Sequence, residues 1–437
     1  MTAATGPADP GTETNGGGAT ETAATDTVVT GIGVLAPSGL DAETHWAAVL
    51  RGGTAIAPVR RFDAAGYPVR LAGELPAFAP AESVPRRLLP QTDVWTQQGL
   101  SAVQAALADA ELETSSVPEY DFAVATASSA GGVEFGQREI QNLWKKGPRH
   151  VGAYQSIAWF YAATTGQISI RHGLRGTCDA LVTEAAGGLD SFATARRALE
   201  DGAAAVVCGA TDSALSPYGL VCQWTSGLLS ERPDPAGAYR PFTADACGYV
   251  PGEGGAMFIV EEHSAAVRRG APHLYGRVAG HAATFSPPPG SDRPPTLRRA
   301  VETALRQASL TPDDIDVVYA DALGVPTADR DEAQALCEVF GPYGVPVTAP
   351  KAGTGRLYCG GSALDVATAL LSMRDGIIPP TPNVDRPAEE YRLDLVTGAP
   401  RRTPVRNALV VSRGYGGFNS ALVLGPVPGQ RGEENST

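Results

Sequence analysis

The sequence lacks the features that mark several large protein classes. Its 437 residues contain no run of about 18 apolar residues, so we expect no membrane-spanning helix. The N-terminus lacks the basic start and apolar stretch of a secretory signal peptide. The six cysteines are scattered without a CxxC pair, which favours reduced thiols over a disulfide framework or a metal site. We therefore expect a cytoplasmic protein without a metal ion.

Basic charge is also scarce. The chain has 34 Lys and Arg against 47 Asp and Glu, a net charge of −13, and no basic stripe. Because phosphate binding needs clustered Lys and Arg, we expect no nucleic-acid partner. Apolar residues (43%) and 51 glycines are abundant, which is typical of a well-packed soluble protein with many tight turns.

The chain divides into two similar halves between two polar ends. Residues 1–26 and 429–437 contain almost no large apolar residues, and we expect both to be disordered. Between them, short apolar strands alternate with helical segments, first over 27–262 and again over 263–428. This alternation predicts βαβ units with a parallel sheet, and the repeat suggests a duplication. Predicted strands are 27–34, 121–126, 204–209, 256–260, 275–278, 315–320, 407–412 and 420–424; predicted helices are 40–51, 97–112, 188–200, 295–307, 333–340 and 363–373.

The segment TEAAGGLD at 183–190 joins a predicted strand to a predicted helix. Such a junction directs backbone N–H groups and the positive end of the helix dipole at the turn, where a cysteine would become a thiolate nucleophile. The turn carries Ala185 instead, which cannot form a thioester.

Four segments resemble the β-ketoacyl synthases: VVTGIGVLAPSG, TEAAGGLD, RPFTADACGYVPGEGG and SRGYGGFNSALV. The resemblance implies a thiolase-like α/β fold, with two duplicated βαβαβ halves in a layered α-β-α-β-α core. Aligning GLD places Ala185 on the nucleophilic cysteine. Asp321 falls on the histidine of the family's AHGTGTP motif, and Arg356 on that of KxxxGH. Lys351 and Glu332 keep their family places. The six histidines lie elsewhere, and we interpret them as surface or structural residues.

A sequence without the nucleophile and both histidines resembles one branch of this family, the chain-length factors (ketosynthase beta subunits) of type II aromatic polyketide synthases. The phrases EFGQREIQNLW, AWFYAATTGQISIRHGLRG and GRLYCGGSALDV resemble that branch, and the resemblance spans residues 27–425. It implies a chain that is not an enzyme alone. The chain would pair with a catalytic ketosynthase alpha subunit as a heterodimer, and the two would form the tunnel for a growing poly-β-ketone. Acyl groups would arrive on the phosphopantetheine arm of an acyl carrier protein, with no other cofactor.

A helical segment bears on product length. Val133, Gly136 and Ile140 lie at i, i+3 and i+7, on one helix face. Taken alone, this spacing is more typical of a core face. The resemblance implies instead that the face lines the end of the tunnel. Because these side chains are small, we expect a long tunnel and a decaketide or longer product.

The turn formed by Gly414, Tyr415, Gly416, Gly417 and Phe418 resembles the ketosynthase GFGG gating loop, with Tyr415 in place of the gating phenylalanine. Its glycines permit positive φ, and both a gate and a simple turn remain open.

Other functions also remain open. The branch usually has glutamine at position 185, so the residue found there leaves open whether any decarboxylation remains. A malonyl-carrier decarboxylase or an unorthodox condensing acyltransferase would need another nucleophile. Thr183 and Ser191 are the nearest hydroxyls, and neither has a histidine at the matched positions. A stand-alone thiolase-like binding protein is a third possibility.

Overall fold

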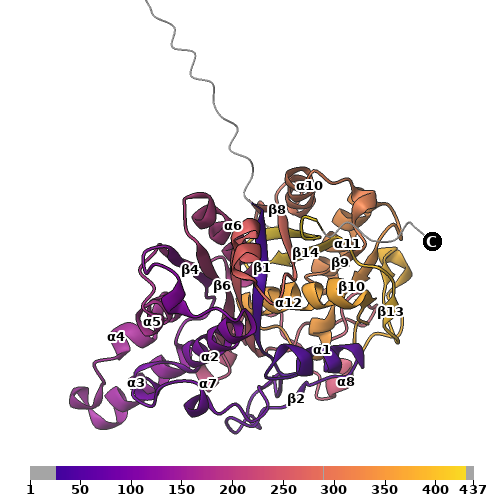
Figure 1. Cartoon of the computed structure of the whole chain (residues 1–437). Helices are drawn as coiled ribbons and strands as arrows, with labels where there is room; N and C mark the ends of the chain where they lie inside the picture. Colours follow the sequence, from indigo (N-terminus) through magenta and orange to yellow (C-terminus); the bar gives the residue numbers. More distant parts are fainter. Residues whose placement is uncertain (1–25, 289, 430–437) are drawn as a thin grey trace, which may run out of the picture.

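The computed structural model describes residues 26–288 and 290–429 (Figure 1). Of the two ends that we expect to be disordered, all but Asp26 and Gly429 lie outside the described residues, so that prediction stays untested. No helix of the described part of the chain is long and apolar enough to cross a membrane.

Eleven strands form one mixed sheet made of two parts, with the order β5-β4-β6-β7-β1 in the first and β8-β15-β14-β9-β10-β12 in the second. The parts meet where β1 pairs with β8 over only two residue pairs. The strands of the first part are β1 (Thr27–Leu35), β4 (Phe122–Ala127), β5 (Cys178–Leu181), β6 (Ala205–Ser213) and β7 (Glu253–Glu262). Those of the second are β8 (Gly276–Phe285), β9 (Val317–Tyr319), β10 (Pro346–Thr348), β12 (Asp394–Leu395), β14 (Ala408–Arg413) and β15 (Phe418–Gly425).

The prediction of a parallel sheet is only partly right. β4, β5 and β6 run parallel to one another, as do β9, β10, β12 and β14. However, β7 is antiparallel to both β6 and β1, and β15 is antiparallel to both β14 and β8. The connection from β6 to β7 starts and ends at the same end of the two strands, since Ser213 lies opposite Glu253. The same holds for β14 and β15, where Arg413 lies opposite Asn419. Such connections need no crossover helix and so give antiparallel neighbours.

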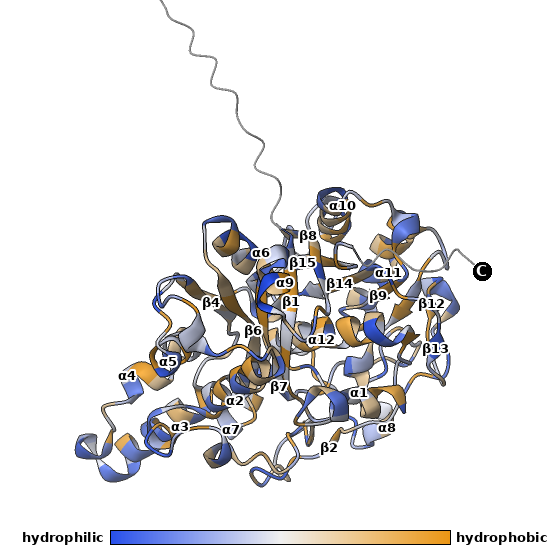
Figure 2. Ribbon diagram, viewed as in Figure 1, coloured by the Kyte–Doolittle hydropathy of each residue, from blue (hydrophilic) through white to orange (hydrophobic). Residues whose placement is uncertain are grey.

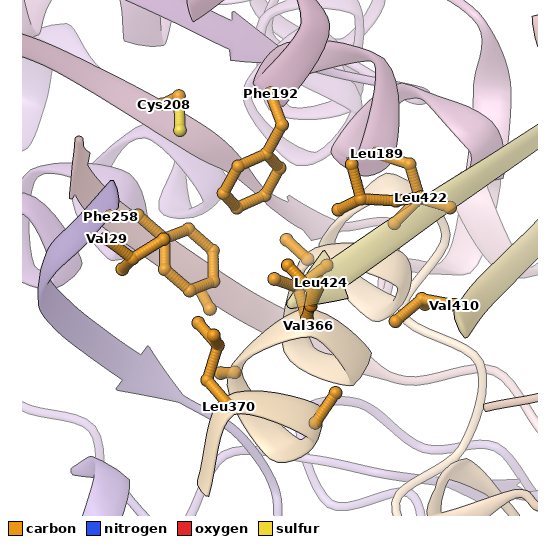
Figure 3. Close-up of a cluster of buried hydrophobic side chains, with 14 of the residues drawn as sticks. Val29, Leu189, Phe192, Cys208, Phe258, Val366, Leu370, Val410, Leu422 and Leu424 are labelled. Carbon is orange, nitrogen blue, oxygen red and sulfur yellow. The ribbon is translucent and has the colours of Figure 1, made fainter. Parts of the chain in front are cut away.

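The sheet parts and helices form five layers, which confirms the expected α-β-α-β-α arrangement. Helices α6 (Gly187–Glu200) and α12 (Cys359–Asp375) lie between the two parts of the sheet (Figures 1 and 3). Strand β6 is covered on both faces, because its successive side chains point in opposite directions. Val206 and Cys208 pack with Phe192 of α6 in the middle layer, whereas Val207 packs against α2 in the outer layer. The outer helices are α2 (Val94–Asp109) and α5 (Ala163–His172) on one side, and α10 (Leu297–Ala308) and α11 (Pro326–Phe340) on the other.

Close packing in the middle layer depends on glycines. A Cβ on Gly188 of α6 would lie 2.4 Å from the carbonyl oxygen of Cys359, and one on Gly360 would lie 2.0 Å from that of Gly254. Helix α12 is buried over its first three turns. Its first residue, Cys359, packs against Gly188 of α6, so residues from the two halves of the chain meet there.

Smaller elements complete the fold. They are α1 (Ala42–Leu50), α3 (Val133–Lys146), α4 (Gln155–Ala158), α7 (Pro217–Trp224), α8 (Pro235–Ala238) and α9 (His263–Arg269), with the short pairs β2 (Ala57–Pro58)–β3 (Leu71–Ala72) and β11 (Ile377–Ile378)–β13 (Arg401–Arg402). The predicted boundary between halves, at 262 and 263, falls between β7 and α9. The division into halves itself stays a prediction.

Candidate functional site

Ala185 lies in a short 3-10 turn, η5 (Glu184–Ala186), between β5 and α6. It is buried, and its carbonyl oxygen accepts hydrogen bonds from Ser362 Oγ at 2.6 Å and Ser412 Oγ at 3.0 Å. The two serines come from α12 and β14 of the second half. The methyl group of Ala185 offers no nucleophile at this junction.

The carboxylate of Asp321 is held by two arginines. Asp321 Oδ1 lies 2.9 Å from Arg356 Nη2 and also accepts the backbone N–H of Arg413 at 2.9 Å, while Oδ2 lies 3.4 Å from Arg413 Nε. Arg356 Nη2 donates in addition to the carbonyl oxygen of Arg413 at 2.6 Å. Asp321 and Arg356 are buried, so each charge needs the other to offset the cost of leaving water.

Glu332, on α11, extends this network. Its carboxylate accepts the backbone N–H groups of Asp321 at 2.7 Å and Ala322 at 2.9 Å, and it pairs with Arg413 Nη2 at 3.1 Å. Two carboxylates and two guanidiniums thus form one connected cluster, and Arg413, which the motifs did not single out, belongs to it. We call Asp321, Glu332, Arg356 and Arg413 the charge cluster.

Asp321 and the two arginines of the charge cluster do not exchange protons near neutral pH as histidines do. Burial alone would raise the pKa of Asp321, but Arg356 and then Arg413 outweigh it and hold that pKa below its usual value. Burial raises the pKa of Glu332, against the opposing effect of Arg413. Guanidinium groups do not deprotonate in proteins, and Asp321 stays ionised. Neither Asp321 nor Arg356 therefore offers a group that exchanges a proton near neutral pH.

Lys351 makes a separate ion pair. It lies in a 3-10 turn, η7 (Pro350–Gly353), and its Nζ is 2.6 Å from Asp365 Oδ2 on α12. Burial raises the pKa of Asp365 to about 6, although Lys351 opposes the shift. Lys351 is also near enough to contribute to lowering the pKa of Asp321.

A cavity of about 1070 Å³ opens over the charge cluster. Its lining includes Glu184, Arg356, Arg413 and the turn 414–418. This turn joins β14 to β15 and has positive φ at Gly416 and Gly417 (88° and 120°), which explains both glycines. Glu184 Oε2 accepts the backbone N–H of Tyr415 at 2.8 Å, and the Tyr415 ring is 69% exposed. Whether the turn acts as a gate stays a prediction.

The two hydroxyls near Ala185 already have partners. Thr183 Oγ1 donates to Asp190 Oδ2 at 2.6 Å, and Ser191 Oγ donates to the carbonyl oxygen of Gly188 at 2.7 Å. Sequence reasoning missed His281 of β8, whose Nε2 lies 3.0 Å from Asp190 Oδ1. No motif marks His281, because the fold alone brings it to Asp190 across 91 positions.

The α3 face predicted from the sequence is not a core face. Val133 and Gly136 are half-buried and Ile140 is 52% exposed, whereas α3 buries Phe135 and Glu139 on another side. The interpretation of the face as part of this chain's core is therefore wrong.

Apolar surface continues from this face onto neighbouring elements. Exposed large side chains extend along α3 and around α4, whose ribbon is coloured apolar in Figure 2. They are Ile140, Leu143, Trp144, Tyr154, Ile157, Trp159, Phe160 and Tyr161, which we call the aromatic surface. In the same half, β5 forms an edge of the sheet, with Cys178, Asp179 and Ala180 exposed. Exposed apolar patches and open strand edges mark sites of protein association.

Comparison with known proteins places this geometry in a family. The family model "Beta-ketoacyl synthase, N-terminal domain" matches residues 24–266, and "Beta-ketoacyl synthase, C-terminal domain" matches 275–385. The chain belongs to the β-ketoacyl synthase family. Within this family the chain is 57% identical over 398 residues to the tetracenomycin polyketide synthase ketoacyl synthase beta subunit of Streptomyces glaucescens, covering 91% of this chain and 97% of that protein. It is thus grouped with the ketosynthase beta subunits, as the sequence motifs indicated.

Solved structures of β-ketoacyl synthases and their relatives share the fold. The ishigamide ketosynthase/chain length factor aligns with a TM-score of 0.83 at 24% identity, over 92% of this chain and 100% of that one. A complex titled AntDE:AntF, a type II polyketide synthase acyl-carrier protein with its ketosynthase, gives a TM-score of 0.83 at 24% identity, over 93% and 100%. These alignments confirm the thiolase-like fold expected for a member of this family.

Proposed function

We propose that this chain is the non-catalytic, chain-length-determining subunit of a type II aromatic polyketide synthase. One observation carries the proposal: Ala185, Asp321 and Arg356, which the resemblance aligns with the nucleophile and both histidines of a ketosynthase, are a buried methyl group and a buried ion pair. A ketosynthase must form a thioester and move protons, and these groups do neither.

The catalytic partner is a ketosynthase alpha subunit, which binds this chain as a heterodimer. The aromatic surface and the open edge of β5 support this, because a stable interface buries an apolar centre and edge strands accept pairing. The name of the Streptomyces glaucescens relative, a beta subunit, points to the same kind of assembly.

The partner receives acyl groups on the phosphopantetheine arm of an acyl carrier protein, and no other cofactor is required. The α3 face forms part of the tunnel wall in the heterodimer. Its residues Val133, Gly136 and Ile140 leave room for a decaketide or longer chain, because their side chains are small and none is fully buried in this chain's own core.

The test is covalent labelling of the reconstituted heterodimer with a radiolabelled acyl carrier thioester. We expect label on the alpha subunit only and poly-β-ketone products only when both subunits are present. Stoichiometric label on this chain would overturn the proposal. It would favour an unorthodox condensing enzyme, and replacement of Thr183 by Val would then show whether that hydroxyl carries the acyl group.

A further inference from the structure

Helix α3 begins without a capping side chain of its own. Its N-cap residue is Gly132, yet the first N–H groups of any helix need acceptors. Asp93, 42 positions earlier, supplies one: its Oδ2 accepts the backbone N–H of Phe135 at 2.6 Å. The other oxygen, Oδ1, accepts the N–H of Trp95 at 3.2 Å, which caps α2. One buried carboxylate therefore caps two helices.

A second contact holds the same turn of α3. Arg61 Nη2 lies 3.1 Å from Glu134 Oε2, and Arg61 Nη1 pairs with the buried Glu253 of β7. Glu253 Oε2 also accepts from Gln98 Nε2 of α2 at 3.0 Å. The first turn of α3 is thus fixed to α2 and β7 through Asp93 and Arg61.

These contacts act on the turn that carries the tunnel face. Phe135 lies between Val133 and Gly136, so the hydrogen bond from Asp93 fixes the backbone next to two of the three face residues. The solvent-exposed remainder of α3, around Trp144, has fewer constraints from the core. The position of the tunnel wall therefore depends on the beginning of the helix.

We propose that Asp93 is a positioning residue for product length: it sets where the α3 face stands in the tunnel without touching the polyketide. This inference rests on the function proposed above. A growing chain stops where packed side chains resist further extension, so a wall that can move allows a wider range of stopping points.

The test is Asp93→Ser in the reconstituted heterodimer. Serine is a good N-cap for α2, but its single short hydroxyl cannot also reach Phe135. We expect the product distribution to broaden, with the ratio of the main chain length to its neighbours falling by about fivefold, a change equivalent to about 1 kcal/mol. The matched control is Asp41→Ser, which alters the exposed cap of α1 and should lower stability slightly while leaving product lengths unchanged.

If Asp93→Ser does not fold, the milder variant Glu134→Gln takes its place. Glu134 is partly exposed, so we expect this change to leave the fold intact. It removes only the ion pair with Arg61, and we expect a smaller broadening in the same sense. Unchanged products in a folded Asp93→Ser heterodimer would overturn the inference. If substitutions on the α3 face itself do change chain length, the proposed function survives that result; if they do not, the proposed function fails as well.

Discussion

Asp321 and Arg356 are two buried residues whose charges depend on one another. An arginine alone at position 356 would leave a buried positive charge, and an aspartate alone at 321 a buried negative one, each at a cost of several kcal/mol. Together with Arg413 and Glu332, the two side chains form ion pairs that balance one another's charge. The groups of the charge cluster therefore all have partners of opposite charge.

At this scale we predict that Asp321→Asn destabilises the subunit by about 3–5 kcal/mol at neutral pH, because it leaves the buried Arg356 without a counter-charge and leaves Arg413 with Glu332 alone. The measurement is the free energy of unfolding in urea, with the exposed Asp313→Asn as the control. The pKa of Asp321 is lowered in the folded state from the usual 3.8, so its stabilisation is present above about pH 4 and is lost as the pH falls through the folded value. The gap between wild type and Asp321→Asn should therefore narrow on acidification to about pH 3. A gap that stays constant, or an equal effect of Asp313→Asn, would contradict the importance of the ion pairs.

At the scale of elements, the proposed role of α3 in product length can be tested by substitution. We predict that Gly136→Thr combined with Ile140→Phe shortens the products of the heterodimer. A Cβ at Gly136 meets only Gln155 Nε2, at 3.7 Å, so the larger residue fits without a clash within this chain. The added side chains instead fill the tunnel, where overpacking resists extension. The assay is mass spectrometry of products from the reconstituted system.

The control for this variant is Gln141→Phe, which adds a ring to an exposed position of the same helix but off the face. It should leave chain length unchanged. Equal shortening by both variants would mean that bulk anywhere on α3 acts through the interface, and unchanged length in the double variant would remove the tunnel role of the face.

Elements were predicted from the sequence better than their arrangement. Most strands and helices lie where apolar periodicity placed them, but α12 begins at Cys359 and not at 363, because close packing against Gly188 and Gly254 outweighs the low helix propensity of its glycines. Strand direction was partly wrong, because strands buried on both faces have the same apolar composition in parallel and antiparallel pairs.

For the site, motifs located Ala185, Asp321 and Arg356. In the structure β14 links them, because Ser412 donates to Ala185 and the N–H of Arg413 donates to Asp321. Asp321 in turn pairs with Arg356. The partners that hold them, Arg413 and Ser362 among others, could not be predicted, because each contact depends on a fold that joins residues far apart in sequence.

Within the described residues, many of the exposed large apolar side chains belong to the aromatic surface on α3 and around α4. Figure 1 shows these two helices near each other at one end of the molecule. We predict poor solubility for the chain alone and a stable one-to-one complex on co-expression with its ketosynthase. Ile157→Asp, at a side chain that is 51% exposed on α4, should weaken the complex at least about tenfold, or about 1.4 kcal/mol, by placing a charge in an apolar interface.

Val267→Asp is the control, since Val267 is 54% exposed on α9, outside the aromatic surface. Size-exclusion chromatography and titration of the two purified subunits would measure both effects. A monomer that is well behaved alone and ignores the ketosynthase would contradict the assembly, as would equal weakening by the two charges.

The pairing of β1 with β7 also sets the order of events during synthesis. Thr27 lies opposite Glu262, so the first strand to leave the ribosome finds its partner only when the first half of the chain has emerged. At translation rates of about 5–20 residues per second, β1 waits roughly 10–45 s with both edges unpaired. Long-range pairing of this kind folds slowly and leaves apolar strands accessible to other chains. Because β1 pairs with β7 only at this late point, the newborn chain is open to aggregation while most of its first half is being made.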